Sequence, residues 1–133
     1  MMKHITDKYT EHTYAILRIV TGFLFFWHGT VKLFGFPKEP NAAEPLYVIW
    51  TAGPIEVIGG PLLMLGLFTR PVAFLSSGLM AAAFFMVKAP VSLLPMLSNG
   101  DLAVLYCFVF LYMSAKGSGI WSIDAWREKN KVC

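Results

Sequence analysis

Residues 25–35 read FFWHGTVKLFG, and the interpretation of the whole chain depends on this stretch. Its aromatic and aliphatic side chains suit an apolar environment, whereas His28 and Lys32 are a titratable and a charged residue four positions apart. Residues with this spacing lie on the same face of an α-helix. The stretch therefore predicts a helix in apolar surroundings that carries one polar face.

The composition extends this interpretation to the rest of the chain. Of its 133 residues, 56% are hydrophobic and 14% are charged, whereas a soluble domain averages about 45–50% apolar and about 25% charged residues. A soluble protein of this composition would have too little polar surface to cover itself. We therefore interpret the chain as one integral membrane domain covering residues 1–133.

The net charge of +3 does not indicate a nucleic-acid-binding protein. Lysines and arginines lie mainly at the ends of apolar segments, and no basic run could follow a phosphate backbone. The two cysteines, Cys107 and Cys133, belong to no C-x-x-C or metal-type spacing. We therefore expect no nucleic acid, no disulfide framework, no covalent cofactor and no metal site.

Four apolar segments predict an all-α, membrane-embedded four-helix bundle, with a soluble four-helix bundle as the alternative. The expected spans cover about residues 14–36, 46–68, 72–88 and 101–116. A bilayer core needs roughly 20 helical residues. The last two segments are short, so their flanking residues Lys88 and Lys116 are expected to extend outward to the interface.

The distribution of basic residues predicts the orientation in the membrane. With four spans, both termini and the turn at Arg70 share one side, and most of the basic residues belong to that side: Lys3, Lys8, Arg70, Lys116, Arg127, Lys129 and Lys131. Cytoplasmic loops carry an excess of Lys and Arg. We therefore expect cytoplasmic termini and a multi-pass protein of the bacterial-type inner (plasma) membrane.

The first expected span carries its polar residues on one side. At about 100° per residue, a stripe of roughly 80° contains Arg18, Thr21, Phe25, His28 and Lys32. A charged residue at the centre of a lipid-facing helix costs about 2.5 kcal/mol or more. We therefore expect this stripe to face the inside of the bundle.

The second expected span offers Glu56 as a partner for this stripe. At 1.5 Å per residue, Glu56 lies about 15 Å from the outer end of its helix and His28 about 12 Å from the outer end of the first helix. The two helices are antiparallel, so His28 and Glu56 should lie at similar depth. A carboxylate beside an imidazole can form a charge-assisted hydrogen bond or share a proton. The alternative for this pair is a purely structural role.

Further polar residues are expected at the two ends of the bundle. Lys88 and Asp101 should join Lys32 in the outer half, although each has an alternative role as an outward-reaching lysine or a helix cap. Arg18, Arg70 and Asp124 could form a second group at the cytoplasmic end, where Arg18 is alternatively an interfacial charge.

Several of these residues stand in stretches that resemble the DoxX family of small four-helix membrane proteins. The stretches are LRIVTGFLFFWHGTVKLFGFP at 17–37, IEVIGGPLLMLGLFTRPVA at 55–73, NGDLAVLY at 99–106 and GSGIWSIDAW at 117–126. Asp101 stands where the family usually has a glutamate, and Pro61 where it usually has an aliphatic residue. The resemblance implies a four-helix membrane bundle associated with membrane redox or oxidative-stress complexes.

From these observations we expect a redox-associated subunit that binds a quinone or a similar lipophilic molecule. His28 and Glu56 are the candidate catalytic residues, because reducing a quinone requires proton donors near its carbonyl oxygens. The remaining candidate binding residues are Arg18, Trp27, Lys32, Lys88 and Asp101. If the chain is catalytic, it is a component of a quinone-linked oxidoreductase.

Two other functions stay open at this stage. The chain has no haem motif, dinucleotide fingerprint or cysteine pair, so it could be a non-catalytic anchor or accessory subunit of a partner redox complex. The same polar stripe could instead serve a small-solute or proton pathway, for which four short spans are few unless the protein forms a homo-oligomer. The lipid bilayer is the expected surrounding in each case.

Overall fold

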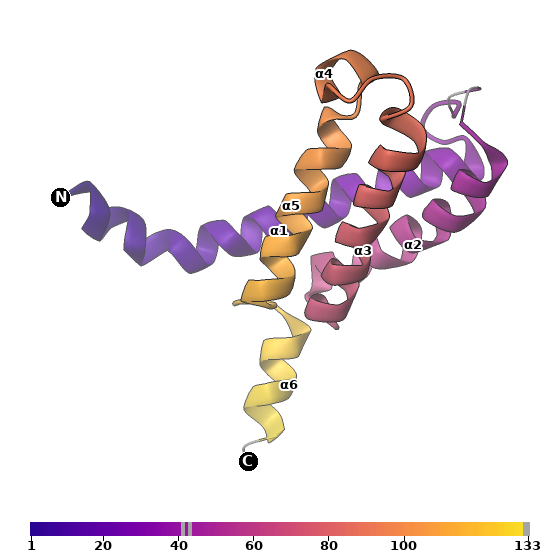
Figure 1. Cartoon of the computed structure of the whole chain (residues 1–133). Coiled ribbons are helices and arrows are strands. Elements are labelled where there is room, and N and C mark those ends of the chain that lie inside the picture. Colours follow the sequence, from indigo (N-terminus) through magenta and orange to yellow (C-terminus); the bar gives the residue numbers. More distant parts are fainter. Residues whose placement is uncertain (41, 43, 132–133) are drawn as a thin grey trace.

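The computed structural model describes residues 1–40, 42 and 44–131, and all regular structure within these residues is helical (Figure 1). The elements in chain order are α1 (Met2–Phe34), α2 (Leu46–Leu65), α3 (Thr69–Ala83), the π-helix η1 (Phe84–Lys88), α4 (Pro95–Ser98), α5 (Asp101–Lys116) and α6 (Ile123–Lys131). The expectation of an all-α chain is confirmed for the described residues.

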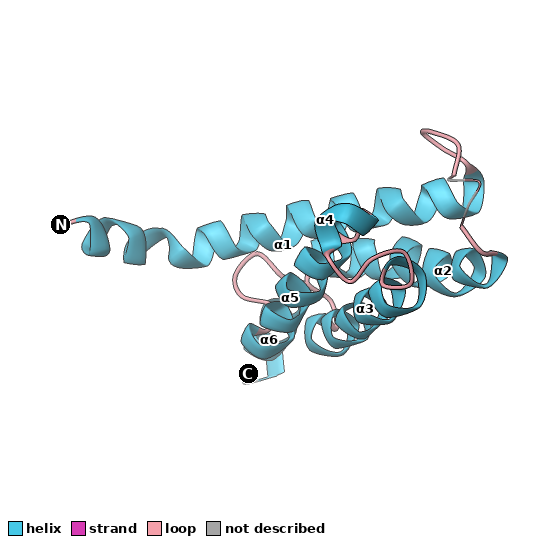
Figure 2. Ribbon diagram, turned by 45° about the horizontal axis from the view of Figure 1, so that its top comes forward, coloured by secondary structure: helices cyan, strands magenta, loops and turns pink. Residues whose placement is uncertain are grey.

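The long helices form two antiparallel pairs, α1 with α2 and α3 with α5, and α2 also packs on α3 (Figures 1 and 2). Aromatic side chains join the two pairs. The ring of Phe25 on α1 lies 4.7 Å from the ring of Phe110 and 5.9 Å from that of Tyr106, both on α5. The core therefore lies where α1 crosses the α3–α5 pair.

Within the described residues, three helical segments are long and apolar enough to cross a membrane: Met2–Phe34, Leu46–Leu65 and Thr69–Lys88. The third consists of α3 continued by η1. Large apolar side chains such as Phe74, Phe85 and Phe108 are exposed on the outside of the bundle. These features are those of a membrane protein.

The first helix begins earlier than expected, at Met2 rather than near residue 14, and ends at Phe34. No glycine or proline interrupts the residues before Tyr14, so nothing among them ends a helix. Residues 2–13 are exposed, and this end of α1 extends beyond the other helices in both views (Figures 1 and 2). The polar segment therefore prolongs the apolar one instead of preceding it as a loop.

The ends of the other helices follow local backbone chemistry. Gly66 adopts a left-handed conformation (φ 67°) and ends α2 at Leu65, three residues before the expected boundary. The expected fourth helix and α5 have the same bounds, Asp101–Lys116. The short helices α4 and α6 were not predicted.

Close contact between α1 and α2 depends on glycines. A Cβ atom built on Gly60 would lie 2.7 Å from the carbonyl oxygen of Gly22, and one on Gly22 would lie 2.6 Å from that of Gly60. Further along the same contact, a Cβ on Gly29 would lie 2.7 Å from the backbone nitrogen of Val57. Only residues without a side chain allow the two backbones to approach this closely.

Substituting Gly60→Ala should therefore separate α1 from α2. We expect a loss of about 1–3 kcal/mol in the free energy of unfolding, the typical cost of overpacking. Gly78→Ala on α3 is the matched control, because a Cβ at that position would have no heavy atom within 4 Å apart from its own chain neighbours and helix backbone. Thermal unfolding in detergent compares the two, and equal melting temperatures would contradict the role given to the glycine contact.

Candidate functional site

A cavity of about 200 Å³ lies between the two helix pairs. Its walls come from α1, α2, α3, η1 and α5, and from the segments that precede α2 and α5. The lining residues are Phe25, His28, Lys32, Glu44, Val48, Glu56, Met80, Ala83, Val87, Lys88, Asn99, Leu102, Ala103 and Tyr106. The cavity thus combines apolar walls with several titratable side chains.

An ion pair between Lys32 and Glu56 forms one side of this cavity. The Lys32 ammonium donates a hydrogen bond of 2.6 Å to Oε1 of Glu56. The Glu56 side chain is 1% exposed and that of Lys32 is 14% exposed. The second carboxylate oxygen, Oε2, is buried and has no hydrogen-bond partner among the described residues. Half of this carboxylate is therefore available to another group.

Tyr106 supplies a second buried polar atom without a partner among the described residues to the wall of this cavity. Its ring is stacked on that of Phe110, with centroids 5.6 Å apart and planes inclined by 12°. Its hydroxyl group is buried and, within the described chain, makes no hydrogen bond. Buried polar atoms nearly always have a partner, which can be protein, water or ligand. Tyr106 was not predicted, although it closes the NGDLAVLY stretch.

His28 lines the same cavity but does not form the expected pair with Glu56. In the structure the hydrogen-bonded partner of Glu56 is Lys32, one helical turn further along α1. The His28 ring instead meets the ring of Tyr106 edge-on at 5.9 Å, and the residue is exposed. In the cavity wall Glu56 is thus paired with Lys32, and His28 lies beside Tyr106.

Three predicted binding residues, Trp27, Asp101 and Arg18, lie outside the cavity wall. Trp27 packs its ring against Phe23, Phe26 and Phe36, on another side of α1. Asp101 is exposed in the first turn of α5, whereas Asn99, two residues earlier, lines the cavity. Spacing along the chain could not show that Asn99, and not Asp101, lines the cavity.

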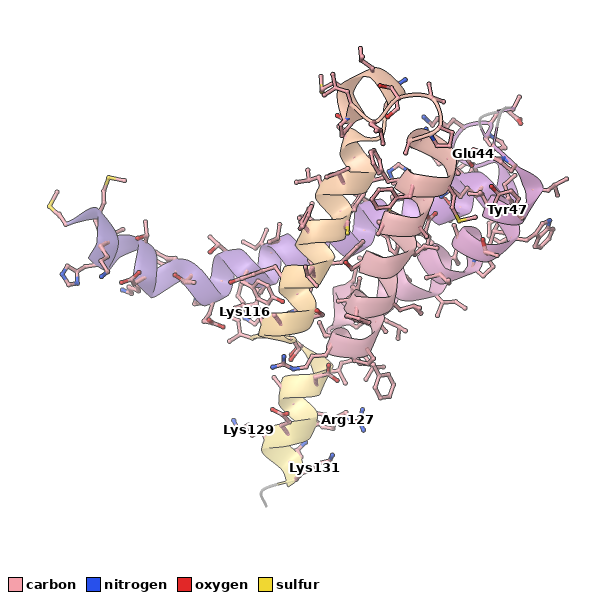
Figure 3. All side chains as sticks on the ribbon, viewed as in Figure 1. Glu44, Tyr47, Lys116, Arg127, Lys129 and Lys131 are labelled. Carbon is pink, nitrogen blue, oxygen red and sulfur yellow. The ribbon has the colours of Figure 1, made fainter. Side chains whose placement is uncertain are left out.

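Lys88 lines the cavity as expected, and the shape of its helix accounts for its position. In η1 the backbone nitrogen of Ala89 bonds to the carbonyl oxygen of Phe84, five residues back. A π-turn inserts one extra residue and rotates the side chains that follow, and such turns are frequent at functional sites. Glu44 also lines the cavity, although it was not predicted. It lies just before α2 and is labelled in Figure 3.

The described residues contain no cluster of three or more histidine, cysteine, aspartate or glutamate side chains that could hold a metal ion. What the cavity does offer is hydrogen-bonding chemistry in an apolar setting. Lys32 and Tyr106 carry donors, Glu56 has a free acceptor oxygen, and His28 has a ring that can donate or accept.

Comparison with known proteins agrees with this architecture. The DoxX family model matches residues 13–89, which include the α1–α2 pair and its ion pair. The chain belongs to the DoxX family. An uncharacterized protein of Haemophilus influenzae is 39% identical over 124 residues, covering 89% of this chain and 92% of that protein.

A second relative of this DoxX protein comes from Bacillus subtilis and bears the name "Putative oxidoreductase CatD". It is 28% identical over 129 residues, and the alignment covers 94% of both chains. No solved structure matches the chain.

Arg18 has a different place in this DoxX chain from the one predicted for it. It is fully buried but does not line the cavity. Its guanidinium group donates to four backbone carbonyl oxygens, those of Leu63, Ser118, Ile120 and Trp121. Arg18 therefore fixes the segment after α5 to the α1–α2 pair.

Asp124 completes this attachment. Its carboxylate accepts hydrogen bonds of 3.0 Å from the backbone nitrogens of Phe68 and Thr69, at the start of α3. The backbone nitrogen of Asp124 in turn donates to the carbonyl oxygen of Gly66. A carboxylate on free N–H groups at a helix start is a helix cap, here supplied from 55 residues further along the chain.

Replacing Arg18 by lysine should release the segment after α5. A lysine ammonium has three donors and lacks the planar fork of arginine, so buried carbonyl groups would be left without partners, at about 1–3 kcal/mol. We expect a lower melting temperature and faster proteolysis within residues 117–131. Arg127→Lys, an exposed exchange of the same kind, is the control, and equal proteolysis rates in both variants would contradict this role.

Proposed function

We propose that the cavity binds the headgroup of a quinone or a similar lipophilic carbonyl compound, as part of a redox-associated membrane subunit. The observation that carries this proposal is a pair of buried polar atoms in the wall of one cavity, Glu56 Oε2 and the Tyr106 hydroxyl, neither of which has a hydrogen-bond partner in the described part of the chain. A ligand with a carbonyl oxygen would accept from Tyr106. Its reduced form, with a hydroxyl group, would donate to Glu56.

The size of the cavity favours a single ring. Drug-sized ligands occupy pockets of about 300–1,000 Å³, whereas this cavity measures about 200 Å³. One six-membered ring with its oxygens fits such a volume, between the apolar side chains of Phe25, Met80 and Leu102. A longer hydrocarbon chain on the same molecule would remain in the lipid.

The polar residues have separate roles in this proposal. A quinone that takes up electrons also needs protons at its carbonyl oxygens. Tyr106 would hold one oxygen by donating its hydroxyl proton. Lys32 donates to Glu56 across a 2.6 Å hydrogen bond. In this proposal Lys32 gives a proton to the ligand, and the negative charge then left on Glu56 is neutralised by a proton taken up from outside.

His28 would connect this group with the exposed side, because it lines the cavity and is itself exposed. Electrons would come from a partner protein, since the sequence carries no haem motif or dinucleotide fingerprint. The name of the Bacillus subtilis relative supports a redox setting for this proposal.

Binding of a short-chain benzoquinone to the purified protein tests the proposal directly. Tyr106→Phe removes one hydroxyl group and keeps the stacked ring, so the fold should survive. We expect binding weaker by roughly 2- to 12-fold, because one hydrogen bond contributes about 0.5–1.5 kcal/mol. Calorimetry in detergent micelles measures the dissociation constant.

Tyr112→Phe is the matched control, because Tyr112 lies on the same helix and is 54% exposed. It should bind the quinone as the unsubstituted protein does. If the folded protein binds no quinone, or if both variants lose affinity equally, the cavity is not a quinone site. A non-catalytic accessory subunit would then be the better account.

We further propose that α5 is a fourth span and that α6 faces the cytoplasm of a bacterial-type inner membrane. The 16 residues of α5 extend about 24 Å at 1.5 Å per residue, against a hydrocarbon core of about 30 Å. Lys116 at its end can reach the interface. Arg127, Lys129 and Lys131 lie on α6, and this excess of positive charge is typical of the cytoplasmic side.

Cysteine labelling tests this orientation. In a chain carrying Cys107→Ser and Cys133→Ser, a single cysteine replaces either Lys38, between α1 and α2, or Lys129, on α6. A membrane-impermeant maleimide added to intact cells should label only the Lys38→Cys protein, and permeabilised cells should give labelling of both. Labelling of Lys129→Cys in intact cells would reverse the proposed orientation.

A further inference from the structure

A larger hollow, of about 520 Å³, lies at the opposite end of the bundle and shares no lining residue with the quinone cavity. It is formed by the α2–α3 turn, the segment after α5 and one side of α6. Its lining residues are Phe68, Thr69, Arg70, Pro71, Lys116, Gly117, Ser118, Gly119, Asp124, Ala125, Arg127, Glu128 and Lys131.

Arg70 is held in a fixed position at this hollow. Its Nη1 donates to the carbonyl oxygens of Ser114 and Ala115, at 3.0 and 2.6 Å, and its Nη2 donates to that of Lys116 at 3.3 Å. These carbonyls belong to the last turn of α5, where no further helical N–H is available to them. The guanidinium group is therefore oriented by the protein before any ligand arrives.

The bonds to α5 leave one edge of the Arg70 guanidinium group unused. A guanidinium group has five N–H donors, and the three bonds to α5 use both on Nη1 and one on Nη2. The Nε–H has no partner within the described chain, and Nη2, which adjoins it on the guanidinium plane, keeps one N–H beyond its bond to Lys116. Two parallel N–H groups of this kind match the oxygens of a phosphate or carboxylate.

Gly117 allows the guanidinium group to lie flat against the backbone. A Cβ atom at this position would lie 3.0–3.2 Å from Nη2, Cζ and Nε of Arg70, nearly the same distance from all three. A side chain there would press on the face of the group. The glycine also has a φ of 91°, which other residues rarely adopt.

The hollow carries an excess of positive charge. Its cations are Arg70, Lys116, Arg127 and Lys131, and its anions are Asp124 and Glu128. Asp124 already accepts from two backbone nitrogens, and Lys116 is paired with Glu11 outside the hollow. Arg127 and Lys131 lie four residues apart on α6 and extend to the same side, whereas Lys129 extends to the other (Figure 3). Among the described residues, Lys131 has no ionic partner.

The location of the hollow fits a membrane surface. It lies where α2, α3 and α5 reach their ends, and the neighbouring Trp121 and Trp126 are 59% and 65% exposed. Exposed tryptophans at the ends of membrane helices typically lie at headgroup level. Basic pockets between helices at this level suit anionic lipid headgroups.

We propose that this hollow binds the phosphate group of an anionic phospholipid. The free edge of Arg70 holds two phosphate oxygens, and Arg127 and Lys131 supply further positive charge from α6. Occupation of the hollow joins the α2–α3 turn to α6 through the same ligand. The site is independent of the quinone proposal, since it uses none of the same residues.

Phosphatidylglycerol binding to the detergent-purified full chain, followed by native mass spectrometry, tests this site. The double variant Arg127→Gln/Lys131→Gln removes two charges from the hollow and leaves Arg70 with its structural bonds. We expect the dissociation constant to rise roughly 10- to 30-fold, because each lysine or arginine contributes about 1 kcal/mol near an anionic surface.

Lys3→Gln/Lys8→Gln is the control, because it removes the same charge from the other cytoplasmic segment, on exposed positions of α1. Its affinity should stay within about twofold of that of the unsubstituted protein, because surface substitutions typically change free energies by only a few tenths of a kcal/mol. If both double variants lost affinity for phosphatidylglycerol equally, net charge alone would explain the loss, and the proposed site would be wrong. Displacement of the lipid by glycerol phosphate at equal concentration would assign the hollow to a soluble phosphate compound and overturn the lipid part.

Discussion

The contact between the α1 and α2 backbones is the constraint on which the remaining features depend. In a bilayer, lipid tails are as apolar as leucine side chains, so helices associate through close packing rather than by escaping from water. Gly22, Gly29 and Gly60 provide that packing, because none of them holds the neighbouring backbone away. The same contact brings Lys32 next to Glu56 and thereby fixes one wall of the cavity.

The ion pair in that wall is an expensive feature for a protein interior. Removing two charges from water costs several kcal/mol for each ion, and mutual attraction repays this only when further hydrogen bonds complete the arrangement. Here one oxygen of Glu56 has no partner among the residues that the structure describes, and the same holds for the Tyr106 hydroxyl in the same cavity wall. A pair retained only for stability would be expected to satisfy these atoms, so the arrangement favours a site that a ligand completes.

Much of the architecture could be predicted from the sequence, because hydrophobicity and helical periodicity are local properties. The extent of α5 and the depth shared by Glu56 and the polar face of α1 followed from counting residues. Counting residues could not decide between Lys32 and His28 as the partner of Glu56, because two residues one turn apart differ by only about 6 Å in depth. Glu44 was missed because it lies in a proline-rich connection, where no periodic pattern points to a site.

Arg18 also has a consequence for how the protein is made. The carbonyl oxygens that it binds on Ser118, Ile120 and Trp121 follow it by 100 to 103 residues. During synthesis its helix enters the membrane long before those residues leave the ribosome. Arg18 therefore lies in an apolar helix without most of its final hydrogen-bond partners until the segment after α5 has been translated. Assembly of the bundle is completed from its last helices, and the membrane insertion machinery has to tolerate one buried charge until then.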